Sequence, residues 1–393
     1  MTEYRYSIPT TIEPPASSGN NPGGFSSGDR FVIQTDILSK RQTKPGTFRL
    51  NGSLILQAKV GDNWEPVDQS IHHVKLDPYG GSSGVIYSVQ TSIDDVQYES
   101  ILEYARLTSV LNQTRYSGYD MASSDGCMEL MRYPTDGFQD VDVGDAQGLL
   151  FPSLDSTGKP QFEMPISIDL DVCVNKVAVP SSKHSQIQFS FRLADANKIG
   201  LTSSVATQFR YFLKNVELRY QLEPEQPTQG PVMMPVHNHS FLASIINRVN
   251  SITHSPAQAF HTMFMTFIKN SHINAGQNNF TYSYLANEAL TEKPRLVEFK
   301  VKGASDVNKY PLRFIESEIL HQFLLAAKEG IWTHNHDVSL AGLEQTVKQG
   351  FGLGTIMSQM FPPNTQVSVN IELDSVPTET YSCFVYTVGE IPL

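Results

Sequence analysis

Histidines at strand spacing are the residues of this sequence best suited to metal chemistry. His237 and His239 form one pair, and His334 and His336 form another. Because alternate residues of a strand point to the same face, each pair could supply two ligands to one metal ion. A cupin-type site also needs a nearby glutamate and a distant histidine, and Glu344 lies eight residues beyond His336. The strand pattern around the second pair is poor, so a cupin-type metal enzyme is a less favoured hypothesis.

Other catalytic constellations are incomplete. His72 and His73 are adjacent, so in a strand they point to opposite faces and do not easily share a metal ion. Gly350-Phe-Gly-Leu-Gly354 is rich in glycine but lacks the Lys-Ser/Thr of a phosphate-binding loop. Ser181-Ser-Lys-His184 is interpreted as a loop, not as part of a triad. We identify no nucleophile elbow, HExxH or CxxC.

Paired acids have simpler interpretations than acid–base catalysis. Asp94-Asp95 is predicted to lie at a helix N-terminus, and Asp169 and Asp171 on the solvated face of a strand. The sequence therefore predicts that the protein is not an enzyme. It predicts no catalytic residue, no cofactor-binding residue and no metal ligand.

Composition narrows the class of protein. The chain has 393 residues, 40% hydrophobic and 18% charged, which suits two or three globular domains. The net charge is −11 and no basic run exceeds Lys40-Arg41, which argues against sequence-specific binding of nucleic acid. Cys173 and Cys383 lie in strand patterns and are predicted to be buried thiols, folded in a reducing compartment. The N-terminus does not resemble a signal peptide, and no apolar stretch predicts a membrane span.

A strand pattern that occurs twice organises the chain. From Ile166 to Val172, apolar residues alternate with Ser167, Asp169 and Asp171, which predicts a strand with one buried face. The stretch 366–373 repeats this pattern. A Phe-Pro precedes each copy, and a predicted helix precedes each Phe-Pro, at 95–110 and 312–328. This ordered set predicts two copies of one β-rich domain.

Further segments complete each copy. Strand patterns occur at 30–37, 47–60, 70–76, 85–92, 186–193, 208–222, 279–285, 295–301 and 380–388. The stretch 241–249 could be helix or strand, and 257–268 is apolar without a clean period. Ser92 with Asp95 resembles a capping box for the first helix. The predicted face of the second helix consists of Leu312, Ile315, Ile319, Phe323 and Ala326.

Polar segments divide the chain into an N-terminal arm at 1–29, a first domain at 30–222, a linker at 223–231 and a second domain at 232–393. The arm has almost nothing to bury and is either disordered or ordered on a neighbouring subunit. The linker contains three prolines. A long loop at 113–148 carries aromatic residues that could form a subunit interface or pack on their own domain: Tyr116, Tyr119, Tyr133 and Phe138.

Two β-rich domains of about 180 residues, each with many strands and one main helix, favour two jelly rolls or related sandwiches. A carbohydrate- or receptor-binding β-sandwich, such as a spike, is an alternative. It would use Tyr- and Asn-rich segments such as Asn278-Asn-Phe-Thr-Tyr-Ser-Tyr284 to stack on sugars, although that segment also suits an ordinary strand.

The layout resembles the double jelly-roll major capsid proteins of the lineage that includes tailless membrane-containing phages, virophages, polinton-like viruses and adenoviruses. The similarity rests on the arm, Gly84-Val-Ile-Tyr-Ser-Val-Gln90 leading into an acidic helix with Glu99, the linker, the helix at 312–328, and the ending from Phe361-Pro-Pro-Asn to Thr380-Tyr-Ser-Cys-Phe-Val-Tyr386. It covers about residues 30–393 and is a resemblance of layout and length.

The resemblance implies a mainly β chain of two tandem eight-stranded jelly rolls, each with a flanking helix. It implies a homotrimer that forms pseudo-hexagonal capsomers, then an icosahedral shell in the virion, after synthesis in the host cytoplasm. Implied partners are the chain itself, penton and minor capsid proteins, and the lipid of an internal membrane, with no cofactor. The arm at 1–29 should contact a neighbour or the shell interior, so its deletion should leave the trimer but impair shell assembly.

Overall fold

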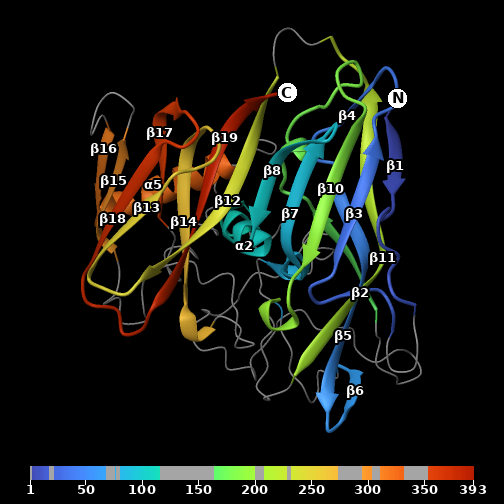
Figure 1. The fold of residues 1–393 in the computed structure, drawn as a ribbon, viewed down its shortest axis with the longest axis horizontal. Coiled ribbons are helices and arrows are strands. Elements are labelled where there is room, and N and C mark those ends of the chain that lie inside the picture. The colour runs from blue at the N-terminus through green and yellow to red at the C-terminus, as the bar shows by residue number, and fades with distance from the viewer. Residues whose placement is uncertain are drawn as a thin grey trace.

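A computed structural model describes residues 2–16, 22–67, 76, 80–115, 163–199, 208–227, 232–272, 294–302, 310–331 and 353–393. These residues form two β-sandwiches that lie side by side along the longest axis of the molecule (Figure 1). One long sheet runs through both. The predicted mainly β chain with two tandem jelly rolls is confirmed.

The first roll is built from two antiparallel sheets. In hydrogen-bonded order, one contains β1 (Glu3–Ser7), β11 (Phe209–Pro224), β5 (Arg49–Val60) and β9 (Met164–Asp169). The other contains β3 (Arg30–Asp36), β10 (Gln186–Leu193), β7 (Ile86–Ile93) and β8 (Val96–Leu102). Short strands extend the first sheet: β2 (Phe25–Ser26), β4 (Arg41–Thr43) and β6 (Asn63–Pro66).

The second roll repeats this arrangement. One sheet has the order β12 (Met233–Ile245), β19 (Tyr381–Pro392), β14 (Phe260–Lys269) and β17 (Leu353–Phe361). The other has the order β13 (Val249–His254), β18 (Gln366–Leu373), β15 (Pro294–Lys302) and β16 (Tyr310–Ile315). In both rolls the chain changes sheet in the same sequence. The strands β1, β3, β5, β7, β8, β9, β10 and β11 therefore correspond in order to β12 through β19.

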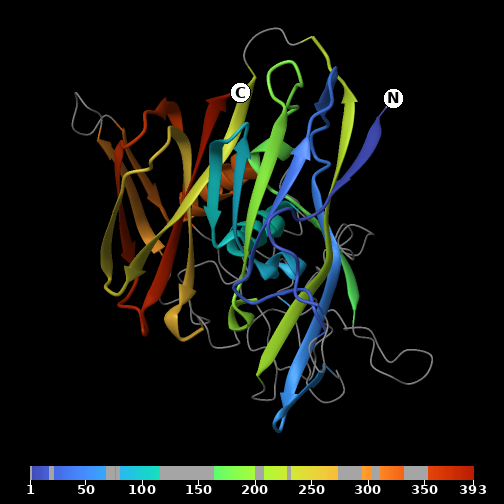
Figure 2. The ribbon, with the colours of Figure 1, turned by 45° about the vertical axis from the view of Figure 1, so that its right-hand side comes forward.

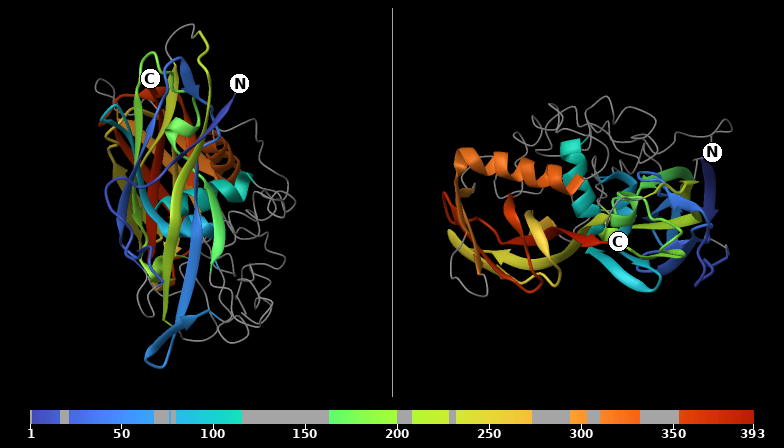
Figure 3. Two further views of the ribbon diagram at one scale, coloured as in Figure 1. Left: turned by 90° about the vertical axis from the view of Figure 1, so that its right-hand side faces the viewer. Right: turned by 90° about the horizontal axis from the view of Figure 1, so that it is seen from above.

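The two rolls share an eight-stranded sheet. β8 of the first roll lies parallel to β12 of the second, with Ser100 opposite Asn238. Helices α2 (Tyr104–Arg115) and α5 (Glu316–Ile331) follow the fifth strand of each roll and pack against each other near this junction (Figure 3). Short 3-10 turns complete the connections: η1 (Gly81–Val85), η3 (Cys173–Asn175), η4 (Ala196–Lys198) and η5 (Asn270–His272).

Alternation along the strands creates the core of each roll. In β10, alternate residues are buried, and Phe189 and Phe191 point into the first roll. Phe191 stacks on Phe31 with ring centroids 5.1 Å apart. In β18 the same alternation buries Val367, Val369, Ile371 and Leu373 in the second roll. The sequence predicted both strands at the residues where they occur.

The N-terminal segment differs from the predicted arm. Glu3–Ser7 pairs with β11 as β1, the first strand of the first roll, at the edge of its sheet (Figure 2). Phe25 in β2 is buried and stacks on Phe31 with ring centroids 4.7 Å apart. The described part of 1–29 therefore belongs to the first roll. Composition concealed this because a single buried aromatic residue and one five-residue strand anchor a segment that is otherwise polar.

Both predicted helices were wrong over their first turns. The segment from Val96 to Leu102 is β8, which forms a hairpin with β7, and α2 begins only at Tyr104. Asp94 and Asp95 have φ values of 45° and 66°, as a two-residue hairpin turn requires, so they are not at a helix N-terminus. Likewise 310–315 is β16, paired with β15, and α5 begins at Glu316. The predicted burial of Ile319, Phe323 and Ala326 is confirmed.

The repeat is real at the level of the rolls but its strand alignment was wrong by one strand. β9 ends at Asp169, and its counterpart in the second roll is β17. β18 instead corresponds to β10, because each lies between the second and fourth strands of its roll. Alternating sequence is common to most one-sided strands, so similarity of pattern did not identify equivalent strands.

Several predicted features lie outside the described residues. These are the strands at 70–76, except for residue 76, and at 279–285, and the aromatic loop residues Tyr116, Tyr119, Tyr133 and Phe138. The strands predicted at 30–37, 47–60, 85–92, 208–222, 295–301 and 380–388 are confirmed within two residues at each end, except that the last runs to Pro392, four residues further than predicted. The ambiguous stretches at 241–249 and 257–268 are largely strand, in β12, β13 and β14.

Candidate functional site

The described residues do not assign a metal site to either histidine pair. His237 and His239 lie in β12, where the register shifts between Asn238 and Phe241. His72, His73, His334, His336 and Glu344 lie outside the described residues. Within the described ranges, no group of three or more His, Cys, Asp or Glu side chains could hold a metal ion.

The Ser181–His184 loop holds the end of the first roll together. His184 Nδ1 lies 2.9 Å from Asp94 Oδ2, whereas Ser181 Oγ donates to Glu225 Oε2 at 2.8 Å. Serine and histidine thus bind different acids and do not form a nucleophile–base pair. Burial tends to raise the pKa of Asp94, but hydrogen bonds from Ser185, His184 and Gln186 outweigh it and lower the pKa to about 2.

Glycine-rich stretches serve packing and turns. Gly354 lies in β17, and a Cβ at this position would approach the Cβ of Ala326 in α5 to 2.7 Å. The glycine therefore allows α5 to lie close to the sheet. Two stretches, 24–28 and 80–84, have the spelling Gly-x-Ser-x-Gly, which the sequence analysis did not consider. Neither is a strand-to-helix turn, because Ser26 belongs to β2 and Ser82 to η1 just before β7.

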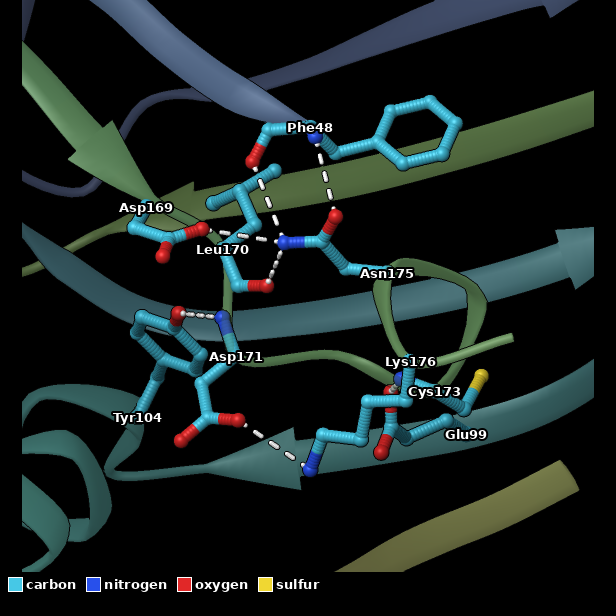
Figure 4. Close-up of polar contacts among 9 residues, drawn as sticks. All are labelled: Phe48, Glu99, Tyr104, Asp169, Leu170, Asp171, Cys173, Asn175 and Lys176. Atoms are coloured by element: carbon cyan, nitrogen blue, oxygen red, sulfur yellow. Dashed lines mark hydrogen bonds and ion pairs between the residues drawn. The ribbon is translucent and has the colours of Figure 1, made fainter. Parts of the chain in front are cut away.

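A buried polar cluster follows β9, where the first roll meets the second (Figure 4). Asn175 Oδ1 accepts from Phe48 N at 2.9 Å, and its Nδ2 donates to Asp169 Oδ1 at 3.0 Å and Leu170 O at 2.8 Å. The Tyr104 hydroxyl accepts from Asp171 N at 2.8 Å. These bonds fix the turn η3, against which β12 packs.

Charged groups complete the cluster. Lys176 Nζ lies 3.1 Å from Asp171 Oδ1, and the two side chains are 0% and 3% exposed. Glu99 of β8 is fully buried, and its Oε2 accepts from Cys173 N at 2.8 Å. Burial raises the pKa of the Cys173 thiol well above its usual range, the Glu99 carboxylate raises it further, and Lys176 partly opposes them.

The sequence analysis missed this cluster. Asp171 was predicted on a solvated face, but the chain leaves the strand after Asp169 and turns Asp171 into the protein, so that prediction was wrong. Sequence spacing gave no signal for Glu99, which reaches Cys173 from a strand 74 residues away.

Two groups of exposed apolar side chains, here called patches, lie on elements near opposite ends of the long axis: β1 at one end, and β13 with its neighbour β18 at the other (Figure 1). The N-terminal patch consists of Tyr4, Tyr6 and Ile8, which are 53%, 58% and 67% exposed. The Arg219 guanidinium lies over the Tyr4 ring, 4.7 Å from its centroid.

The second patch, here called the distal patch, consists of Ile246, Val249 and Val376, which are 52%, 62% and 63% exposed. Ile246 and Val249 flank the turn from β12 to β13, and Val376 follows β18, the strand that pairs with β13. Exposed groups of large apolar side chains are typical of contact surfaces between proteins. Among the described residues, no helix is both long and apolar enough to cross a membrane.

Comparisons with known proteins agree with this architecture. No protein-family model and no curated protein sequence matches the chain. Among solved structures, the Faustovirus major capsid protein is 8% identical, with a TM-score of 0.62 over 100% of this chain and 90% of that chain. A chain of the PBCV-1 virus capsid is 8% identical, with a TM-score of 0.51 over 100% of this chain and 95% of that chain.

The Sputnik virophage structure is 8% identical, with a TM-score of 0.52 over 99% of this chain and 85% of that chain. Identity this low establishes a shared fold. The chain has the double jelly-roll fold of viral major capsid proteins, along its whole length.

Proposed function

We propose that this chain is a viral major capsid protein that forms homotrimeric, pseudo-hexagonal capsomers and assembles them into an icosahedral shell. The observation that carries the proposal is the pair of matching jelly rolls joined through one sheet. The structural match to a viral major capsid protein covers 100% of this chain. The protein acts through its surfaces and not as an enzyme.

The two apolar patches support a ring-forming contact. They lie on different rolls near opposite ends of the long axis of the molecule, so the N-terminal patch of one copy can meet the distal patch of the next. Such a head-to-tail contact closes into a ring when the rotation between copies suits it. Tyr4 and Tyr6 have the aromatic character that often dominates the energy of protein interfaces.

Further parts of the proposal concern the assembled shell. The two described chain ends lie at the same end of the rolls (Figure 1), and we assign that end to the shell interior. Penton proteins, minor capsid proteins and the lipid of an internal membrane are the proposed partners beyond the chain itself. The protein is made in the host cytoplasm and resides in the virion. The polar stretch 223–231 is the proposed linker between the rolls, with its first two residues, Glu223 and Pro224, paired to β4 as the end of β11.

Native mass is the test. Light scattering on a size-exclusion column should give about three times the chain mass of 43.7 kDa, and electron microscopy should show hexagonal particles. Tyr6→Glu and Val249→Glu should each lower the mass to that of a monomer, because a buried unpaired charge opposes association.

Val96→Glu is the matched control, since Val96 is 57% exposed but belongs to neither patch. A monomeric wild-type protein would contradict the proposal and favour a carbohydrate-binding sandwich, which a glycan array would then examine. Trimers that survive both patch variants would contradict the assigned contact while leaving the capsid role in place.

A further inference from the structure

The ion pair in the cluster after β9 is buried, and burial of charged groups is energetically unfavourable. Lys176 and Asp171 have side chains that are 0% and 3% exposed, and their charged atoms lie 3.1 Å apart. They are five residues apart in sequence, and the turn η3 folds the lysine back over the aspartate (Figure 4). Taking two charges out of water carries a desolvation penalty of several kcal/mol per ion, which their attraction does not always recover.

Condensation of the two side chains proceeds through an amine and a carboxylic acid. The contact between Lys176 Nζ and Asp171 Oδ1 provides the path by which one proton passes from the lysine to the aspartate to give that pair. The neighbouring residues in the chain, Leu170, Val172 and Val174, are all fully buried. An amine held against a carboxylic acid in such a site is arranged for attack on the carboxyl carbon, because the entropy of bringing the two together is already lost in folding.

A third acid lies in the same cluster. Glu99 is fully buried, and its Oε2 is fixed by the Cys173 amide at 2.8 Å. Cys173 is the first residue of the turn that joins Asp171 to Lys176, so this bond anchors the Glu99 carboxylate beside the pair. Condensation of an amine with an acid requires a proton to leave the nitrogen and another to reach the departing oxygen. A positioned carboxylate can carry both protons.

We propose that Lys176 and Asp171 form an intramolecular isopeptide bond, with Glu99 as the proton carrier. The bond from Lys176 Nζ to Asp171 Cγ forms, and the bond from Cγ to the carboxyl hydroxyl breaks. Glu99 accepts a proton from the attacking nitrogen and returns it to the leaving hydroxyl, which departs as water. One water is lost for each bond formed, no group is oxidised or reduced, and Glu99 is regenerated.

The bond would close a small ring around η3. β12 of the second roll packs on this turn, and Tyr104 at the start of α2 accepts a hydrogen bond from Asp171 N. The cross-link would therefore hold the junction between the rolls covalently. This inference depends on the described geometry and not on the proposed capsid role.

The intact mass of the denatured full-length chain tests the proposal. The wild-type protein should be lighter than its sequence by one water, and a protease digest should contain a branched peptide that joins Lys176 to Asp171. Lys176→Arg should have the full mass of its sequence, because the guanidinium does not condense. Lys59→Arg is the matched control on an exposed strand position and should keep the loss of water.

Two further variants report on the chemistry. Asp171→Asn should lose ammonia in place of water and so reach the same final mass as the wild type. Glu99→Gln should remain at full sequence mass long after the wild type has closed. A wild-type protein at full mass overturns the proposal, as does a loss of water that persists in Lys176→Arg, which would locate the lost water elsewhere in the chain.

Discussion

Truncation of Phe25 tests whether the N-terminal segment belongs to the first roll. In the structure the Phe25 side chain is 1% exposed, its ring lies 4.7 Å from that of Phe31, and its backbone pairs with Leu213 of β11. The polar composition of 1–29 had instead predicted an arm with nothing to bury. The variant Phe25→Ala separates these two descriptions, because only a packed ring contributes to the free energy of unfolding.

The expected magnitude follows from the burial. Replacing a fully buried phenylalanine by alanine costs about 3–5 kcal/mol. A stacked aromatic pair contributes about 0.5–1.5 kcal/mol beyond burial, so the loss should lie near the middle of that range or above, at about 4 kcal/mol. With a urea dependence of about 2 kcal/mol per molar, the unfolding midpoint of the first roll should fall by about 2 M.

Fluorescence of Trp64 provides the assay. The chain has two tryptophans, and Trp64 in β6 belongs to the first roll, so a Trp332→Phe background reports on that roll alone. Ile12→Ala is the control, because Ile12 is 49% exposed on the same segment, belongs to neither patch, and its truncation should change stability by less than about 1 kcal/mol. If Phe25→Ala shifts the midpoint no further than Ile12→Ala does, Phe25 is not part of the core.

The same contacts change the expected effect of deleting residues 1–29. That deletion removes β1 and β2, both paired with β11, so the first roll loses one of its eight principal strands. The deleted protein should unfold at lower urea or aggregate, and it should not leave an intact trimer. Recovery of a stable trimer after deletion would show that the arm predicted from the sequence is the better description.

Three further predictions concern packing, pH and reactivity. Gly354→Ala places a methyl group 2.7 Å from a side chain of α5 and should cost about 1–3 kcal/mol, seen as a lower Tm; an unchanged Tm would contradict that packing. The depressed pKa of Asp94, about 2 in place of 3.8, adds stability above pH 3.8 that disappears toward pH 2. Asp94→Asn should therefore lower stability at pH 7 by about 1 kcal/mol, since partial exposure screens the charge, and the difference from wild type should close between pH 4 and 2. Burial raises the pKa of the Cys173 and Cys383 thiols, so in a Cys127→Ser background an alkylating reagent should modify them only after urea unfolds the rolls.

Strand periodicity made much of the fold predictable from the sequence. The stretches at 186–193 and 366–373 alternate strictly, and both are strands at those residues, with one face in a core. The face of α5 at Ile319, Phe323 and Ala326 was also predictable. Burial of one face imposes a period on the residue types, and that period survives in the sequence whatever the strand pairs with.

Contacts between distant residues were not predictable in this way. The pair Asp94-Asp95 is compatible both with a helix N-terminus and with a hairpin turn. The pairing of Ser92 with Gln97 shows that it forms the turn. The pairing of Glu3 with Leu222 makes a strand from a polar segment. The choice of β10 as the counterpart of β18 depends on hydrogen-bonded order, which the alternation does not encode.

The sequence by itself determined the class of the protein: two β-rich domains, their best strands and one helix face, because local periodicity reports which face is buried. Only the tertiary structure decided that residues 3–7 close the first roll and that β8 and β12 join the rolls. It alone brought Glu99 to the turn between Asp171 and Lys176. The physical reason is that a buried charge is stabilised by groups close to it in space. When such a group comes from a distant strand, no regular spacing in the sequence indicates the contact.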